Sequence, residues 1–371
     1  MATELRIALV HDWLTNLGGA ERVLLLMHQA FPKAPIYTSI FNPKKLPEFA
    51  KLNVRTSFLQ KFPLAKKKHQ LYPTLRRLAF ESFDFSKFDI VISSSSAEAK
   101  GIITSTETFH ISYINTPTRY YWSGYNEYLK SPGYGVFNPF VRLIMPRLVK
   151  KMRRWDYAAA QRPDIIIANS ENVKKRIKKY YNRDSLVLHP PVDLSRFKPD
   201  KDEGYYLVVS RLIPYKRIDL AVKACSNLNK KLVVIGSGSE YKKLKSMSNS
   251  NVHFTGALTD REINNYYKNA LAFIFTAEED FGITPLEAMA SGKPVICYGA
   301  GGAKETVIDN ETGIYFEKQN EQSLQNAIKK FEKMEFNQNK IIDRAEQFSE
   351  DNFIKKLKEV IEVNYEEFIK T

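Results

Sequence analysis

The sequence predicts an α/β protein made of two doubly wound domains, and three observations lead to this prediction. A chain of 371 residues is too long for one compact core and suits two domains of roughly 150–200 residues each. Short β-branched runs alternate with helical patterns, which is typical of a parallel sheet with helices on both faces. The alternation is interrupted at 189–204, where His-Pro-Pro and Lys-Pro-Asp indicate an extended connection.

The predicted strands fall into two sets of six. Those of the first half are Leu5–Val10, Ile36–Ile40, Asp89–Ser94, His110–Ile114, Asp164–Ala168 and Leu186–Leu188. Those of the second half are Tyr205–Ser210, Lys231–Ile235, Val252–Phe254, Ala272–Phe275, Pro294–Cys297 and Gly313–Phe316. We therefore place the first domain at 1–190 and the second at 191–348. The final helical stretch, 349–371, has an apolar face and no strand after it, so we expect it to pack back on the first domain.

Composition limits the classes of function that fit the chain. No apolar run approaches the ~20 residues of a membrane span. The first residues lack the basic region, apolar core and cleavage site of an export signal. Cys225 and Cys297 lie in apolar segments and form no disulfide or metal-ligand pattern. We therefore expect a cytoplasmic protein. No paired aspartates are placed to clamp a metal, so we also expect neither a metal nor a cofactor.

The net charge of +15 is unevenly distributed along the chain. Residues 1–200 hold 32 Lys and Arg against 16 Asp and Glu, whereas residues 201–371 hold 24 against 25. The first half thus carries +16 and the second half −1. This asymmetry indicates an anionic partner for the first domain, such as a lipid surface or a phosphorylated acceptor. Nucleic acid and a merely solvated basic surface are the alternatives, and no nucleic-acid-binding module is recognisable.

Two basic stretches, Lys61–Arg77 and Val141–Trp155, carry much of the excess charge. Both interleave cations with apolar residues, which is the pattern of a helix at a membrane interface. In the second stretch, a helix packed on the core with a solvated basic face explains the pattern equally well. We therefore expect contact with an anionic membrane mainly through the first stretch, at Lys66, Lys67 and Lys68.

The strongest motif for a ligand site is the segment 279–287, EDFGITPLE, which follows a predicted strand and runs into a helix. Ligands of open α/β sheets bind beyond the carboxyl ends of the strands. The free N–H groups of a helix N-terminus suit a phosphate, and Gly282 allows it to approach the backbone closely. Glu279 on the loop can accept hydrogen bonds from sugar hydroxyls, and Glu287 in the helix can reach ribose hydroxyls. The alternative is an ordinary loop acid and a helix surface acid.

Two cations follow the first predicted strand of the second domain, in the segment Ser-Arg-Leu-Ile-Pro-Tyr-Lys at 210–216. Arg211 and Lys216 can bind a diphosphate and stabilise the charge that it gains as a leaving group, without a metal. Alternatively, both are solvated loop charges. Gly236 and Gly238 form a turn after the next strand but lack the third glycine of a dinucleotide fingerprint, which disfavours a nicotinamide enzyme.

Taken in order, these motifs resemble the retaining glycosyltransferases of family 4, which have the GT-B fold of two Rossmann-like domains facing a central cleft. The likeness rests on the Glu-x7-Glu pair, on the Ser-Arg-Leu-x3-Lys motif, on a glycine pair after the first strand, and on the segments 252–256 and 301–307. It implies catalytic roles for Arg211, Lys216, Glu279 and Asn115. It also implies a donor site that includes Gly18, Gly19, Gly236, Gly256, Asp280, Phe281, Gly282, Ile283 and Glu287.

The segment 110–122 resembles a subgroup in which a strand ends in His-Thr-Pro and is followed by Arg and aromatic residues. Asn115 stands at the place of that histidine, which in the family contacts the donor sugar. An asparagine keeps a hydrogen bond but cannot act as a titrating base. His110 begins the strand, so we expect it at the opposite edge of the sheet, in a structural role. Arg119 and Trp122 suit an acceptor or a membrane, and ordinary helix packing is the alternative.

The resemblance implies transfer of a hexose, with mannose favoured, from a nucleotide-diphosphate sugar. The acceptor is expected to be lipid-linked or a polysaccharide, in the synthesis of bacterial cell-surface glycans at the inner face of the plasma membrane. A non-catalytic protein of the same fold that binds a nucleotide sugar or a glycan is the main alternative, because of Asn115. A nucleic-acid-binding protein, a phosphorylase and an epimerase are further alternatives.

Overall fold

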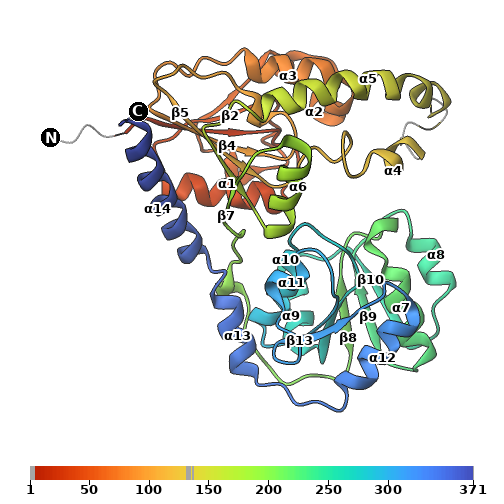
Figure 1. Ribbon diagram of the computed structural model, residues 1–371. Helices are drawn as coiled ribbons and strands as arrows, with labels where there is room; N and C mark the ends of the chain where they lie inside the picture. Colours follow the sequence, from red (N-terminus) through yellow and green to blue (C-terminus); the bar gives the residue numbers. More distant parts are fainter. Residues whose placement is uncertain (1–4, 131–134, 136–137, 371) are drawn as a thin grey trace. The chain divides into compact units, whose positions relative to one another are not determined.

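The computed structural model describes residues 5–130, 135 and 138–370. The chain divides into two compact units: unit 1 comprises 1–188 with 354–371, and unit 2 comprises 189–353. The sequence placed the corresponding boundaries at 190/191 and 348/349. Each unit contains one sheet covered by helices (Figure 1).

Unit 1 contains a seven-stranded sheet with the order β3-β2-β1-β4-β5-β6-β7, and its neighbouring strands are parallel. The strands are β1 (Ile7–His11), β2 (Ile36–Thr38), β3 (Val54–Thr56), β4 (Ile90–Ser95), β5 (Phe109–Ile114), β6 (Ile165–Ala168) and β7 (Leu186–Val187). The six strands predicted for this half are confirmed. The sequence prediction missed β3, because three residues with a central arginine at the edge of a sheet give no apolar run.

The helices of unit 1 are α1 (Gly19–Ala30), α2 (Ala65–Lys68), α3 (Pro73–Glu81), α4 (Tyr125–Lys130), α5 (Asn138–Ala159), α6 (Glu171–Tyr181) and most of α14 (Glu350–Phe368). The last helix joins unit 1 through aromatic contacts, since the Phe109 ring centroid lies 5.9 Å from that of Tyr365 and 5.0 Å from that of Phe368.

Unit 2 contains a six-stranded parallel sheet with the order β10-β9-β8-β11-β12-β13. The strands are β8 (Tyr206–Val209), β9 (Leu232–Ile235), β10 (Val252–Gly256), β11 (Ala272–Phe275), β12 (Val295–Tyr298) and β13 (Gly313–Phe316). The helices are α7 (Ile218–Asn227), α8 (Tyr241–Ser246), α9 (Asp260–Asn269), α10 (Ile283–Ala290), α11 (Ala303–Thr306), α12 (Glu321–Phe331) and α13 (Gln338–Glu346). All six strands predicted for this half are confirmed.

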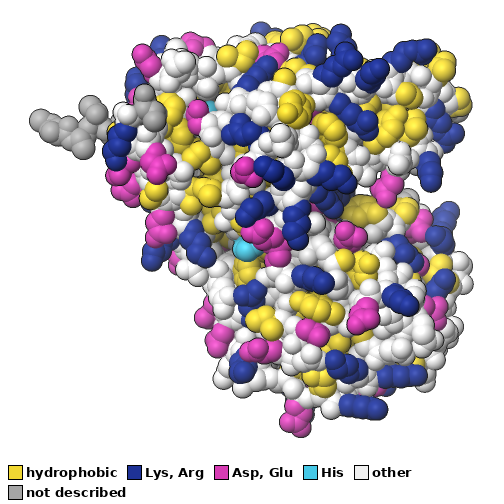
Figure 2. Space-filling model, in the orientation of Figure 1, with side chains coloured by type: hydrophobic (Ala, Val, Ile, Leu, Met, Phe, Trp, Pro, Cys, Tyr) yellow, Lys and Arg dark blue, Asp and Glu magenta, His cyan; other side chains and the backbone are white. Residues whose placement is uncertain are grey.

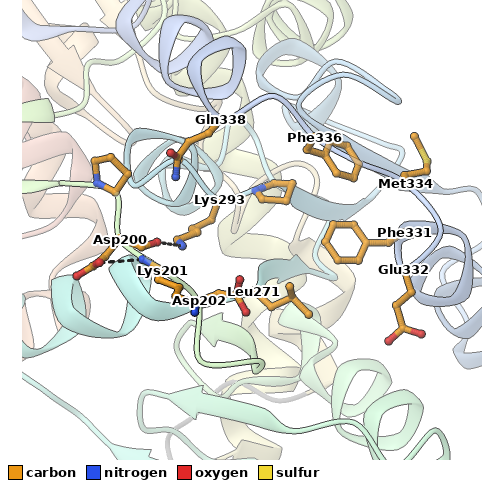
Figure 3. Close-up of a pocket in the computed structure, with 13 residues that line it drawn as sticks. Asp200, Lys201, Asp202, Leu271, Lys293, Phe331, Glu332, Met334, Phe336 and Gln338 are labelled. Atoms are coloured by element: carbon orange, nitrogen blue, oxygen red, sulfur yellow. Dashed lines mark hydrogen bonds between the residues drawn. The ribbon is translucent and has the colours of Figure 1, made fainter.

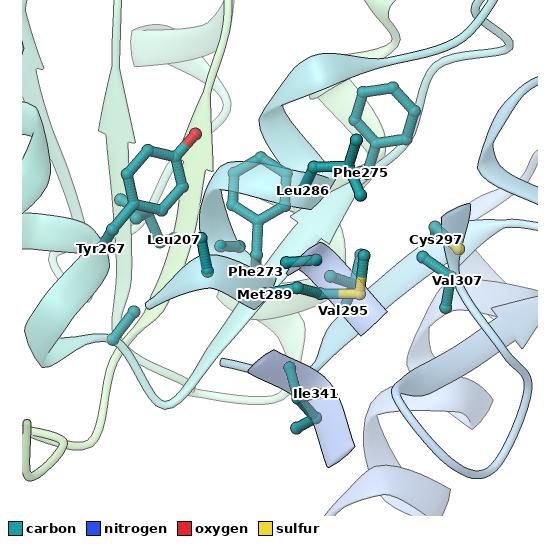
Figure 4. Packing of buried hydrophobic residues seen from close by; sticks show 14 of the residues in the cluster. Leu207, Tyr267, Phe273, Phe275, Leu286, Met289, Val295, Cys297, Val307 and Ile341 are labelled. Atoms are coloured by element: carbon teal, nitrogen blue, oxygen red, sulfur yellow. The ribbon is translucent and has the colours of Figure 1, made fainter. Parts of the chain in front are cut away.

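Both faces of the unit 2 sheet are buried. Because successive side chains of a strand point to opposite faces, Phe273 and Phe275 of β11 belong to one apolar cluster and Ile274 belongs to another. The first cluster includes Leu286 of α10 and Tyr267 of α9 (Figure 4). This packing fixes α10 against the sheet, and the glutamates of the 279–287 segment lie before and within that helix.

Across 5–130 and 138–370, no helix has both the length and the apolar character needed to cross a bilayer.

The two cysteines are buried, and burial raises the pKa of the Cys225 thiol to about 12. A thiol with such a pKa stays protonated at neutral pH and is a poor nucleophile.

Replacing Leu286 with Ala tests the packing that positions α10. Leu286 is fully buried, so we expect the cavity to lower the free energy of unfolding by about 2–5 kcal/mol in urea titrations. Ile308→Ala, at an exposed site of the same unit, serves as the control and should cost below about 1 kcal/mol. Equal losses in the two variants would contradict the assignment of Leu286 to the core.

Candidate functional site

The predicted site residues of unit 2 gather at the carboxyl edge of its sheet. Arg211 and Lys216 follow β8, Gly236 follows β9, Gly256 ends β10, and the segment 279–283 follows β11 into α10. Neighbouring parallel strands end at one edge, so the topology brings these segments together from distant parts of the sequence. The Gly236 N–H donates to the Gly256 carbonyl oxygen at 2.8 Å.

Lys216 and Glu279 form an ion pair at this edge. Their side chains are only 16% and 13% exposed. The Thr276 hydroxyl, at the end of β11, donates to the Lys216 carbonyl oxygen at 2.8 Å. Lys216 is therefore attached to the β11 loop by both its side chain and its main chain. Two groups that the sequence assigned to different parts of one donor thus contact each other, so a phosphate at Lys216 would lie beside the Glu279 carboxylate.

Arg211 differs from Lys216 in being exposed. Its guanidinium Nη2 lies 3.2 Å from the Tyr215 hydroxyl oxygen. A guanidinium held at a sheet edge and open to solvent can bind a phosphate oxygen without first leaving a buried partner.

Close backbone contacts fix the loop that carries Glu279. The Gly302 N–H donates to the Glu279 carbonyl oxygen at 3.0 Å. A Cβ atom on Gly302 would lie 2.2 Å from the Phe281 Cα atom, which excludes any other residue there. Gly282 precedes α10 with a φ of 87°, a conformation that glycine adopts readily. The glycine pair at 301 and 302 therefore allows the close backbone contacts that fix the Glu279 loop.

Glu287 receives a hydrogen bond from a buried tyrosine. The Tyr267 hydroxyl lies 2.9 Å from the Glu287 Oε2 atom. Burial, with the charge of Glu287, raises the pKa of Tyr267 well above its usual value. The hydroxyl therefore stays protonated and donates. Sequence reasoning missed Tyr267, whose only signal was an aromatic pair within an otherwise polar helix.

Asp280 and Phe281 are buried, so their side chains offer little surface to a ligand. The Phe281 ring stacks on His189, with a centroid distance of 5.2 Å. The His189 Nε2 atom lies 2.9 Å from the Glu305 Oε2 atom. Sequence reasoning treated this histidine only as part of the connection between domains. In the structure, His189 and Glu305 support the loop that follows β11.

In unit 1, the predicted residues again lie at the carboxyl edge of the sheet. Asn115 follows β5, and its Nδ2 atom lies 3.3 Å from the Ser94 hydroxyl oxygen at the end of β4. Gly18 precedes α1, and its N–H donates to Glu21 Oε2 at 2.9 Å. Gly19 is the first residue of α1, which follows β1. The glycine pair and Asn115 therefore belong to one edge, as the sequence predicts.

Of the buried histidines of unit 1, His110 and His11 have different settings. His110 of β5 lies 2.9 Å from the Ser93 hydroxyl oxygen, and burial lowers its pKa to about 3. Its expected position at the start of the strand is confirmed. His11 ends β1, with its Nε2 atom 3.5 Å from Glu21 Oε1. Burial disfavours the charged ring of His11, but the hydrogen bond and the charge of Glu21 outweigh burial and raise its pKa.

Asp156 of α5 organises the loop that follows β5. Its carboxylate accepts from the Thr118 hydroxyl at 2.8 Å, the Trp122 indole N–H at 2.7 Å and the Tyr181 hydroxyl at 2.7 Å. Lys100 pairs with the same carboxylate at 2.6 Å, and both charged side chains are buried. Trp122 also stacks on a neighbouring tyrosine ring, so its indole takes part in packing, which was the alternative considered from the sequence.

The basic residues expected at a membrane divide into exposed and buried ones. Lys66, Lys67 and Lys68 of α2 are exposed, and Arg119 is partly buried. Arg76, within the Lys61–Arg77 stretch, is only 3% exposed and pairs with the buried Glu98 at 2.9 Å. The expectation of surface contact is therefore wrong for Arg76, because a carboxylate from elsewhere in the fold neutralises it.

A pocket of about 810 Å³ lies at the other edge of the unit 2 sheet. Its lining includes Leu271, which precedes β11, and Lys293, which lies shortly before β12 (Figure 3). Inside it, the Lys293 ammonium donates to the Asp200 carbonyl oxygen at 2.7 Å. None of the predicted site residues lines this pocket.

Within the described ranges, no group of three or more His, Cys, Asp or Glu side chains is placed to hold a metal ion.

Two family models match the chain. "Glycosyltransferase Family 4" matches residues 17–196, and "Glycosyl transferases group 1" matches residues 191–348. Together they extend over both units.

Curated relatives resemble part of the chain. A GDP-mannose-dependent alpha-(1-6)-phosphatidylinositol monomannoside mannosyltransferase of Mycolicibacterium smegmatis is 29% identical over an alignment of 183 residues, and the match covers 40% of this chain and 48% of that protein. The O-antigen chain mannosyltransferase RfbU of Salmonella typhimurium is 29% identical over an alignment of 208 residues, and the match covers 53% of this chain and 57% of that protein. The chain spans about half the length of the curated relatives it matches.

Solved structures resemble it over nearly its whole length. Anabaena Alr3699/HepE in complex with UDP superimposes with a TM-score of 0.73 at 18% identity, covering 97% of this chain and all of that one. At this identity the likeness concerns the fold.

Replacing Asp156 with Ala tests the buried network of unit 1. The variant leaves the Lys100 ammonium buried without this carboxylate, so we expect a loss of about 3–5 kcal/mol in the free energy of unfolding. Asp184→Ala breaks an ion pair in which the Asp184 side chain is largely exposed and should cost below about 1 kcal/mol. A loss that small for Asp156→Ala in urea titrations would show that the network does not stabilise the unit.

Proposed function

Because the chain belongs to the family 4 glycosyltransferases with the GT-B fold, we propose that it transfers a hexose from a nucleotide-diphosphate sugar to a lipid-linked or polysaccharide acceptor, with retention of configuration. The observation that carries the proposal is the ion pair between Lys216 and Glu279, which is the first residue of the 279–287 segment. This pair puts a phosphate-binding cation and a hydroxyl-binding carboxylate in contact.

The donor diphosphate is held by Arg211, Lys216 and the N–H groups at the start of α10. Positive charge fixed at this edge stabilises the negative charge that the diphosphate gains as the sugar leaves. The two cations supply this charge, so the proposed transfer requires no metal and no cofactor. When a phosphate binds Lys216, the Glu279 carboxylate is available to accept hydrogen bonds from sugar hydroxyls.

Glu287 holds the ribose of the nucleotide. Its Oε2 atom already accepts from Tyr267, which fixes the direction of the carboxylate in the absence of a ligand. A carboxylate has about four acceptor positions, so hydrogen bonds to ribose hydroxyls are compatible with that contact.

A mannose-type hexose is the favoured sugar, because relatives with printed activities include GDP-mannose-dependent and O-antigen chain mannosyltransferases. We assign placement of the acceptor hydroxyl to unit 1, and Gly18, Gly19 and Asn115 at its carboxyl edge keep the donor-contact roles that the resemblance implies. The protein works at the inner face of the plasma membrane in bacterial cell-surface glycan synthesis. The +16 charge of residues 1–200 suits an anionic membrane surface.

A non-catalytic binding protein of the same fold is the second candidate, because Asn115 cannot titrate as a base. Release of nucleoside diphosphate, measured with and without a lipid-linked acceptor, separates the two. A transferase releases it faster when the acceptor is present. Donor binding with no release under either condition would favour the binding protein.

Arg211→Ala is the cleanest test of the proposed leaving-group contact. Arg211 is exposed, so its loss leaves no buried charge unpaired. We expect turnover to fall by ~10²-fold or more, the effect of removing a preorganised electrostatic stabiliser. Lys216→Ala should lower turnover comparably. Arg261→Ala, at an exposed position of α9, is the matched control and should keep normal turnover. A folded Arg211→Ala protein as active as that control would refute the assignment.

The two glutamates should respond differently to substitution. Glu287→Ala is expected to weaken both the donor and the free nucleoside diphosphate, whereas Glu279→Ala should spare the free nucleotide and impair sugar transfer. Tyr267→Phe removes only the hydroxyl that orients Glu287 and should weaken nucleotide binding about five-fold, the value of one hydrogen bond. Calorimetric titrations with free nucleotide and with donor give these affinities. Equal loss of nucleotide affinity in both glutamate variants would contradict the division of roles.

A further inference from the structure

The two halves of α5 have different surroundings. Toward its carboxyl end, Met152, Asp156 and Ala159 are buried against unit 1. Toward its amino end, Phe140 is 63% exposed, Leu143 is 67% exposed and Ile144 is 41% exposed. Residues three and four apart lie on the same side of a helix. The three exposed apolar side chains therefore form one patch, to which we give the name α5 face.

Cations surround the α5 face. Arg142, Arg147, Lys150 and Lys151 are exposed, and residues 138–151 include no Asp or Glu. Figure 2 shows Lys and Arg side chains intermixed with hydrophobic ones over the region where Figure 1 draws α5.

A second segment of unit 1 has the same character. Residues 58–78 also lack acidic residues, and they expose Phe58, Phe62, Leu64 and Leu71 together with the three lysines of α2. The segment leads into α3, whose Glu81 accepts from the Trp155 indole N–H of α5 at 2.7 Å. The two segments are therefore connected through packed neighbours within one unit.

The chemistry of the α5 face favours one kind of partner. A nucleic acid would bind the cations but gives exposed leucine and isoleucine side chains little apolar contact. A second copy of this face would bring like charges together. The surface of an anionic bilayer satisfies both features, because apolar side chains enter the headgroup region while cations meet lipid phosphates.

We propose that the amino-terminal half of α5, residues 138–151, docks unit 1 on an anionic lipid surface by inserting the α5 face, with the α2 lysines adding charge attraction. The inference deepens the proposed function, from which it takes the lipid-linked acceptor. It also shifts the main membrane contact from Lys61–Arg77, where the sequence placed it, to α5.

Co-sedimentation with vesicles tests the docking, with phosphatidylglycerol mixed into phosphatidylcholine and with phosphatidylcholine alone. The wild-type protein should bind the anionic vesicles at least ten-fold more strongly than the neutral ones. F140A/L143A keeps every charge and should weaken binding at least ten-fold, including at salt concentrations that screen charges. R147Q/K150Q/K151Q should weaken binding at least ten-fold at low salt, and K66Q/K67Q/K68Q less than that.

Matched changes on α14 and just beyond it control for general effects. V363A/I369A removes two exposed apolar side chains, and K355Q/K356Q/K358Q removes three exposed charges. Both should bind vesicles within two-fold of the wild-type protein. Circular dichroism checks that each variant is folded.

Several outcomes would overturn the inference. They are no binding of the wild-type protein to anionic vesicles, binding that F140A/L143A leaves unchanged, or equal loss in the α14 controls. Tight binding of a DNA duplex that only the charge variants weaken, with no vesicle binding, would identify a nucleic-acid surface instead. Sugar transfer to a detergent-solubilised acceptor is measured separately. Its failure while α5-dependent vesicle binding persists would count against the proposed function and leave the docking intact.

Discussion

The ion pair between Lys216 and Glu279 is the contact on which the candidate site depends. It joins the segment after β8 to the segment after β11, which are neighbouring strands in the middle of the unit 2 sheet. Gly301 and Gly302 follow the next strand, and they lie in close backbone contact with the loop that carries Glu279. Burial of the β11 side chains on both faces holds the sheet beneath them. The charged side chains at the carboxyl edge of the unit 2 sheet are thus held in place by a packed core. Electrostatic stabilisation of a transition state requires charges that are fixed in this way.

Unit 1 uses buried charge for a different purpose. Asp156 collects donors from three separate segments, and Glu98 binds Arg76. Both networks hold the chain that leaves β5 after Asn115. The same helix that supplies Asp156 exposes apolar side chains at its other end. One element therefore has a structural half and a half available for docking, which explains why its sequence pattern fitted both a core helix and an interfacial helix.

The strands were predictable because β-branched runs in a parallel sheet are buried on both faces and stand out from their surroundings. Short polar β3 was not. The motif residues at the carboxyl edges of the two sheets were predictable, because neighbouring parallel strands end at the same edge. Tyr267, His189 and Glu305 were not, since their importance comes from partners that are distant in sequence. Arg76 shows the same limit: its basic neighbours suggested a surface, and only the fold reveals the carboxylate that neutralises it.

We propose that the cations and carboxylates at the carboxyl edge of the unit 2 sheet support retaining sugar transfer. Proton NMR of a reaction with nucleotide sugar and acceptor follows the anomeric signal directly. We expect the donor signal to decline while a product signal of the same anomeric configuration grows, and we expect this growth to require Arg211. A product of inverted configuration, or a donor signal that stays constant although the nucleotide sugar binds, would contradict it.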